Sequence, residues 1–146
     1  MKDLHFGIDI AAPVARVWDC MLDPIAYRDW TRAFCEGSYY EGSWEAGRRL
    51  RFLDPQGFGM EAIVDEAVPH QRLSLRLVGE IKDGRPVADS PLAQTPAIER
   101  YEFAARPGGT QLTVHLQSWN DGFTDFLQTT WPEALKRLKA LSESTH

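Results

Sequence analysis

The sequence predicts an α+β domain, in which an antiparallel sheet of about seven strands packs against one long C-terminal helix. Three observations predict this class. The chain opens with a segment of period-two hydrophobicity, continues with short alternating segments separated by turn residues, and closes with a helical apolar stripe. Because no helix pattern lies between the middle segments, the strands are expected to pair with one another in antiparallel fashion.

The first elements are a strand and one or two short helices. Apolar residues alternate with polar ones over residues 4–10, which predicts a strand with one buried face. Pro13 opens a helix, since the first helical position needs no backbone N–H. Asp23-Pro24 ends that helix and starts a short second one that reaches Trp30. The core face of the first helix consists of Val14, Val17, Trp18, Met21 and Leu22.

Alternation and turn residues predict six further strands in the middle of the chain. Asp54-Pro55-Gln56-Gly57 and Pro107-Gly108-Gly109 are typical turn sequences. Residues 82–96 contain three prolines and few large apolar groups, so we expect a loop there. Such a long loop is either a lid over a functional site or merely mobile. The expected strands are 38–42, 49–53, 59–68, 72–79, 97–104 and 110–118.

Residues 121–142 form the predicted long helix. Pro132 interrupts its pattern and is expected to kink the helix or to mark a fresh first turn. Trp131, like Trp18 in the first helix, falls on the core face. One helix cannot cover a large sheet face tightly along its whole length. A curled sheet would therefore leave a gap of the kind that small apolar ligands occupy.

Length and charge exclude several classes of protein. The 146 residues suit a single domain spanning 1–146. Sixteen basic and 21 acidic residues give a net charge of −5, which argues against nucleic acid and anionic membranes as partners. No apolar run approaches the length of a membrane span. The N-terminus lacks a signal-peptide pattern, so a cytoplasmic location is expected, with Cys20 and Cys35 as reduced thiols.

No motif in the sequence predicts a metal, a cofactor or a nucleophile. The histidines lack the spacing of a metal site, and neither a G-x-S-x-G nor a Cys–His signature occurs. Gly57–Ala62 fits G-x-G-x-x-A, but a turn precedes it and β-branched residues follow, so a hairpin is expected. The densest basic cluster consists of Arg48, Arg49 and Arg51. Arg49 and Arg51 alternate with Leu50 and Phe52, which predicts a solvated sheet face; the alternative is a site for an anionic partner.

The candidate ligand-binding residues are apolar and aromatic side chains from the helix end, the sheet interior and the first turns of the last helix. Methionine and aromatic groups suit a pocket that tolerates varied shapes, although plain core packing is the alternative for each of them. These candidates are Trp30, Phe34, Phe52, Phe58, Met60, Tyr101, Phe123 and Phe126.

Glu99 is the one polar candidate. It shares strand parity with Tyr101 and Phe103, so it should face inward. A carboxylate in a cavity could bind the polar end of a ligand. Desolvation would raise its pKa and make it a weak candidate for a general acid or base. The alternative is a solvated strand-end residue or one paired with an arginine.

Several segments carry a resemblance to a known superfamily. The run from Phe34 to Gly47, with its "F..GS..EG.WE.G" pattern, is the most characteristic. The chain resembles START-like domains, also called the polyketide-cyclase or birch-pollen-allergen superfamily. Within it, the chain is similar to the subgroup of the heat-shock-protein-90 ATPase activator C-terminal domain. The other matching segments are Ala12-Pro13 with Val17-Trp18, Asp23-Pro24 through Trp30-Thr31, Gly109–Thr113, and Trp131, Leu135 and Leu138-Lys139.

The resemblance implies a helix-grip fold, in which a curved sheet grips the C-terminal helix around a cavity. The superfamily includes lipid carriers, cyclases, hormone receptors and the chaperone activator, and it shares no catalytic residues that could be carried over. We therefore hold three hypotheses: a binder of a small hydrophobic or amphipathic ligand, a chaperone ATPase regulator acting through the outer sheet face, and a cyclase or hydrolase using Glu99. The first hypothesis is preferred. Under it, the protein is a binding protein and not an enzyme.

Overall fold

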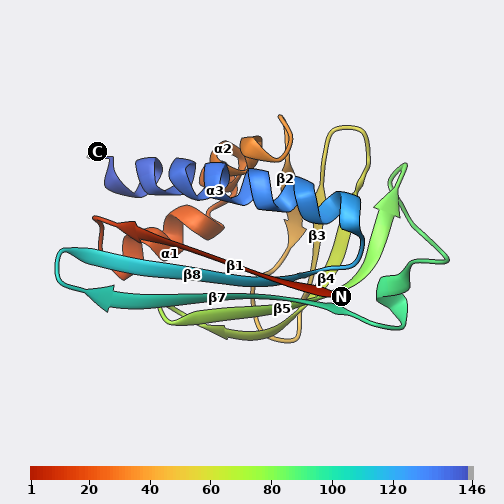
Figure 1. Cartoon of the computed structure of the whole chain (residues 1–146), viewed down its shortest axis with the longest axis horizontal. Helices are drawn as coiled ribbons and strands as arrows, with labels where there is room; N and C mark the ends of the chain where they lie inside the picture. The colour runs from red at the N-terminus through yellow and green to blue at the C-terminus, as the bar shows by residue number, and fades with distance from the viewer. Residues whose placement is uncertain (145–146) are drawn as a thin grey trace.

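A curved antiparallel sheet wraps around the C-terminal helix, which confirms the predicted fold class (Figure 1). The structure is a computed structural model that describes residues 1–144. The sheet has eight strands in the order β1-β8-β7-β5-β4-β3-β2, with β6 paired to β5. The strands are β1 (Lys2–Ile10), β2 (Tyr39–Gly42), β3 (Arg49–Leu53), β4 (Gly59–Val68), β5 (Arg72–Lys82), β6 (Arg85–Pro86), β7 (Ala97–Arg106) and β8 (Gly109–Ser118).

Sheet pairing brings the first and the last strand of the chain together. The first strand, β1, lies beside the last, β8, with Leu4 opposite Leu116 and Ile8 opposite Leu112. The inward residues of β8 are almost completely buried, as their alternation predicts. The helices cover this inner face: α1 (Val14–Leu22), α2 (Pro24–Trp30), α3 (Asp121–Glu143) and the short 3₁₀ helices η1 (Thr31–Ala33) and η2 (Pro91–Ala93).

Side-chain caps mark where α2 and α3 begin. The Asp23 carboxylate accepts hydrogen bonds from the backbone N–H groups of Ile25 and Ala26, which fixes the start of α2. Asn120 does the same for α3 by accepting from the N–H of Phe123. The expected fresh turn at Pro132 is wrong, because α3 continues through this residue. Pro132 lies on the exposed side of the helix, where water can satisfy the carbonyl that its missing N–H releases.

The turn between β3 and β4 explains the G-x-G pattern in structural terms. Gly57 has a φ of 85°, a conformation that costs glycine little. Gly59 lies so close to the neighbouring strand that a Cβ atom there would stand 1.7 Å from the carbonyl oxygen of Phe52. Both glycines therefore serve a tight hairpin, as the sequence predicts.

The segment 82–96 is more ordered than a plain loop. β5 extends to Lys82, three residues beyond the predicted strand end, and β6 folds back onto it. Leu92 of η2 is completely buried. The Ser90 hydroxyl donates to a carboxylate oxygen of Glu80 at 2.6 Å, and the N–H of Val87 donates to the Glu80 carbonyl. The segment is thus anchored to the end of β5.

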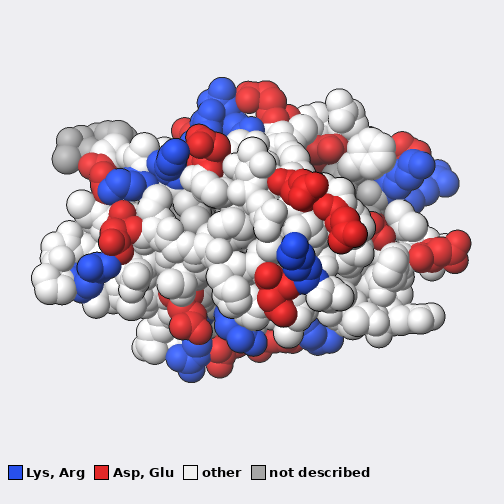
Figure 2. Space-filling view, viewed as in Figure 1, with Lys and Arg blue, Asp and Glu red and all other residues white. Residues whose placement is uncertain are grey.

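Charges on the surface are mixed in sign, as Figure 2 shows for one face. The outer face of the sheet carries ion pairs between neighbouring strands, such as Arg76–Asp65 and Arg72–Glu66. Arg51 is paired with Glu41 in the same way, as expected of a solvated sheet face. Among residues 1–144, no helix combines the length and the hydrophobicity that crossing a membrane requires.

Candidate ligand-binding cavity

A cavity of about 530 Å³ separates the N-terminal half of α3 from the inner face of the sheet. Its volume lies in the range of small-molecule sites. The structure brings all the predicted candidates together around it: Trp30, Phe34, Phe52, Phe58, Met60, Glu99, Tyr101, Phe123 and Phe126.

Trp131 joins the aromatic wall to the core. Its ring packs against Phe34 in a T-shaped arrangement with centroids 5.1 Å apart, and against Trp30 and Tyr101 at about 6 Å. The side chain is 4% exposed and also lines the cavity. Offset and edge-to-face aromatic contacts of this kind favour a fixed arrangement. These contacts tie the cavity wall near α3 to the core.

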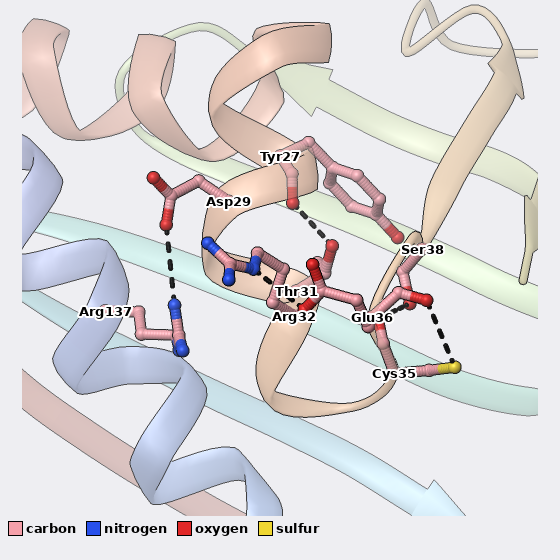
Figure 3. A network of polar contacts seen from close by, with 8 residues as sticks. All are labelled: Tyr27, Asp29, Thr31, Arg32, Cys35, Glu36, Ser38 and Arg137. Carbon is pink, nitrogen blue, oxygen red and sulfur yellow. Dashed lines mark hydrogen bonds and ion pairs between the residues drawn. The ribbon is translucent and has the colours of Figure 1, made fainter.

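Polar contacts hold the wall formed by α2 and η1 (Figure 3). Arg137 of α3 pairs with Asp29 of α2 at 3.6 Å, so the two helices are linked. Thr31 donates to the carbonyl oxygen of Tyr27, and the Ser38 hydroxyl donates to that of Cys35. Cys35 is a free thiol in this wall, and Cys20 is free and buried in α1. The contacts fix the loop that carries Phe34.

The cavity opens to solvent beside two exposed aromatic rings. Phe126 is 41% exposed and Phe58 is 45% exposed, and both line the cavity. Phe126 stacks on Phe123 and lies 6.3 Å from Phe34, so aromatic surface continues from the opening to the interior. Val87, from the anchored 82–96 segment, also contributes to the lining.

Glu99 faces the cavity, as strand parity predicts. Its Oε2 accepts a hydrogen bond from the Tyr101 hydroxyl at 2.7 Å. Burial raises the pKa of Glu99, and the hydrogen bond from Tyr101 opposes part of that shift. Burial also raises the pKa of Tyr27, and the nearby Glu99 charge adds to this effect. A carboxylate and two phenols thus share one apolar wall, where they can accept or donate hydrogen bonds.

A second carboxylate in the lining, that of Glu80, escaped the sequence analysis. It accepts hydrogen bonds from Ser90 at 2.6 Å and from the indole N–H of Trp119 at 3.4 Å. Strict alternation from the buried Leu77 would place Glu80 outward. A register shift between β4 and β5 reverses the parity, so Glu80 lies opposite the inward-facing Met60. The inward orientation of Glu80 depends on this β-bulge alone, and no sequence signal marks the bulge.

Other cavity residues were visible in the sequence but were not assigned to a site. Tyr27 is buried on α2, and its ring contacts those of Tyr40 and Phe52. Trp44 and Trp119 come from irregular segments, for which periodicity gives no orientation. The further lining residues are Met21, Tyr27, Thr31, Cys35, Ser38, Trp44, Leu53, Asp54, Gly59, Glu80, Ile81, Lys82, Val87, Trp119, Asn120, Leu127 and Trp131.

Of the histidines that the structure describes, His5, His70 and His115, none lines the cavity. His5 and His115 stack on each other on the β1–β8 pair, with ring centroids 4.4 Å apart, and His115 contacts Asp3. Within residues 1–144, no group of His, Cys, Asp and Glu side chains has the arrangement of a metal site.

The fold is shared with several solved structures. A protein from Mesorhizobium loti superposes with a TM-score of 0.79 at 15% identity, covering 99% of each chain. One from Chromobacterium violaceum gives 0.75 at 22% identity, covering 98% of each chain. The solution structure of the Aha1 dimer from Colwellia psychrerythraea gives 0.74 at 15% identity, covering 100% of each chain.

Sequence comparison gives the family. No curated protein sequence matches the chain significantly. The family model described as "Activator of Hsp90 ATPase homolog 1-like protein" matches residues 11–143. This match covers all of the described helices, including the whole of α3, and every described strand except β1. The chain therefore belongs to the Activator of Hsp90 ATPase homolog 1-like protein family.

Proposed function

We propose that the protein binds a small hydrophobic or amphipathic molecule in the cavity between α3 and the sheet. The observation that carries this proposal is the cavity itself, with its volume of about 530 Å³ and its largely aromatic wall. Filling it with apolar ligand surface would bury groups that water now contacts, and such burial is favourable. The aromatic rings at the opening give an apolar ligand a continuous path inward.

Native mass spectrometry of gently purified protein is the first test. A small molecule retained in stoichiometric amount, and identified after release, would support the proposal and give the class of the ligand. A direct titration with the neutral fluorescent probe N-phenyl-1-naphthylamine complements it. We expect saturable binding of one probe per chain, and a failure to bind any apolar probe would contradict the proposal.

A pair of tryptophan variants tests whether the probe binds in the cavity. Met60→Trp should fill part of the space and weaken probe binding, because Met60 lines the cavity. Ile63→Trp is the matched control on β4: it lies between the completely buried Ala62 and Val64, so it faces the other side of the sheet. Equal loss of binding in both variants would show that the probe binds elsewhere.

A second candidate function is regulation of a chaperone ATPase through the outer face of the sheet, and the family match favours it. That face carries cross-strand ion pairs, including Arg76–Asp65 at 2.8 Å. An ATPase assay with the chaperone of the same organism tests this function. Arg76→Glu should remove any stimulation, whereas Met60→Trp should not. No change in ATPase rate at saturating protein would eliminate the candidate.

A further inference from the structure

The ionisable side chains in the cavity lining are mostly acidic or phenolic. Two carboxylates, Glu80 and Glu99, lie in its lining, and Asp54 adds a third acidic side chain. Lys82 is the one basic side chain among the lining residues, and it is exposed to solvent. A bound carboxylate or phosphate would therefore meet negative charge without a cation in the interior to offset it.

Among the described residues, hydrogen bonds reach only one of the two carboxylate oxygens of Glu99. Its Oε2 accepts from Tyr101, whereas no hydrogen bond reaches Oε1 from the residues that the structure describes. The side chain lies in the cavity lining and is not completely shielded from solvent. Glu80, by contrast, accepts hydrogen bonds at both carboxylate oxygens. Glu99 is thus the carboxylate that can accept a hydrogen bond from a ligand.

The surroundings of Glu99 suit a cation. Tyr101 and Tyr27 flank it, and the rings of Trp30 and Trp131 belong to the same wall. Aromatic faces attract ammonium groups through their quadrupole, most strongly where water is excluded. An ammonium N–H donated to a carboxylate also makes a charge-assisted hydrogen bond, which is stronger than a neutral one.

We infer that the ligand carries an ammonium group on an apolar or aromatic body, and that Glu99 accepts a hydrogen bond from this group among the aromatic rings. This inference rests on the proposed function, since it specifies the ligand class of the same cavity. It also excludes fatty acids and other anionic amphiphiles as preferred ligands.

Three probes that share one ring system test the ligand class: 1-naphthylmethylamine, 1-naphthalenemethanol and 1-naphthoic acid. Calorimetric titrations at neutral pH should show the amine binding about tenfold or more tightly than the alcohol. The acid should bind more weakly than the alcohol. An amine that binds no better than the alcohol, or an acid that binds best, would overturn the inference.

Two isosteric variants of one strand assign the preference to a residue. Glu99→Gln should abolish the preference for the amine, so that the amine and the alcohol bind with similar affinity. Glu102→Gln removes the same charge from the exposed side of β7 and should keep the preference. Retention of the preference in Glu99→Gln, checked for folding by its thermal melt, would overturn the assignment to Glu99.

The outcomes separate this inference from the proposed function. Binding of the alcohol and of N-phenyl-1-naphthylamine, without any preference for the amine, would refute the ammonium ligand alone. If none of these apolar probes binds, the proposed function fails and the inference fails with it.

Discussion

The two ends of α3 meet the sheet in different ways (Figure 1). Toward the C-terminus, α1 lies beside the helix, and Val17, Leu135 and Leu138 are almost completely buried. Toward the N-terminus, no helix among the described residues takes the place of α1, and the inner sheet face borders a cavity. One helix thus packs as core at one end and as a cavity wall at the other.

The comparison shows where stability and binding reside. The packed end has side chains in contact on all sides, so its truncation should cost the most free energy of unfolding. The hollow end already lacks contacts on one side. Its residues can therefore contact a ligand, and substituting them should cost less free energy of unfolding.

The largest effect is expected for Trp131→Ala, at the boundary of the two regions. The side chain is 4% exposed and contacts aromatic rings from β1, α2 and β7. Its loss should lower the free energy of unfolding by about 3–5 kcal/mol, measured by urea denaturation. A loss below about 1 kcal/mol would mean that this residue does not join the two regions.

A matched pair of leucine truncations on α3 tests the comparison directly. Leu138 is completely buried in the packed end, whereas Leu127 lines the cavity. We expect Leu138→Ala to cost about 3–5 kcal/mol and Leu127→Ala about 2 kcal/mol or less, because fewer atoms surround Leu127. Equal losses in urea denaturation would refute the distinction between the two ends.

Glu99→Gln tests the hollow end through the pH dependence of its stability. Because burial raises the pKa of Glu99, the native state keeps its proton where the unfolded chain has lost it. The wild type should therefore lose stability as pH rises through that raised pKa. We expect the variant to have the higher melting temperature at about pH 8 and no advantage at about pH 4, below the ordinary carboxyl pKa. Glu102→Gln, on the exposed side of β7, is the matched control for the loss of one carboxylate.

The smallest effect on stability is expected at the cavity opening. Phe126 is 41% exposed, so Phe126→Ala should cost less than about 1 kcal/mol. Because its ring continues the aromatic surface into the cavity, the variant should still weaken binding of N-phenyl-1-naphthylamine. Thermal melts and probe titrations measure the two effects. A large loss of stability with unchanged affinity would reverse the roles assigned to this end of the helix.

Part of the candidate site could be predicted because regular elements orient their side chains. Period-two alternation placed Phe52, Tyr101 and Glu99 on the inner face, and all three line the cavity. Glu80 could not be found in this way, since the shift in register between β4 and β5 reverses its orientation. Trp44 and Trp119 lie outside regular elements, where no periodicity applies.

The sequence by itself determined the order of the main elements, the inner face of the regularly paired strand segments and the family. Those properties depend on local periodicity, turn residues and caps, which neighbouring residues specify. Only the tertiary structure decided that α1 packs beside one end of α3, while a cavity separates the other end from the sheet. It also decided that the 82–96 segment is anchored through Leu92. These features depend on how distant segments divide a shared volume, and local pattern carries no information about that volume.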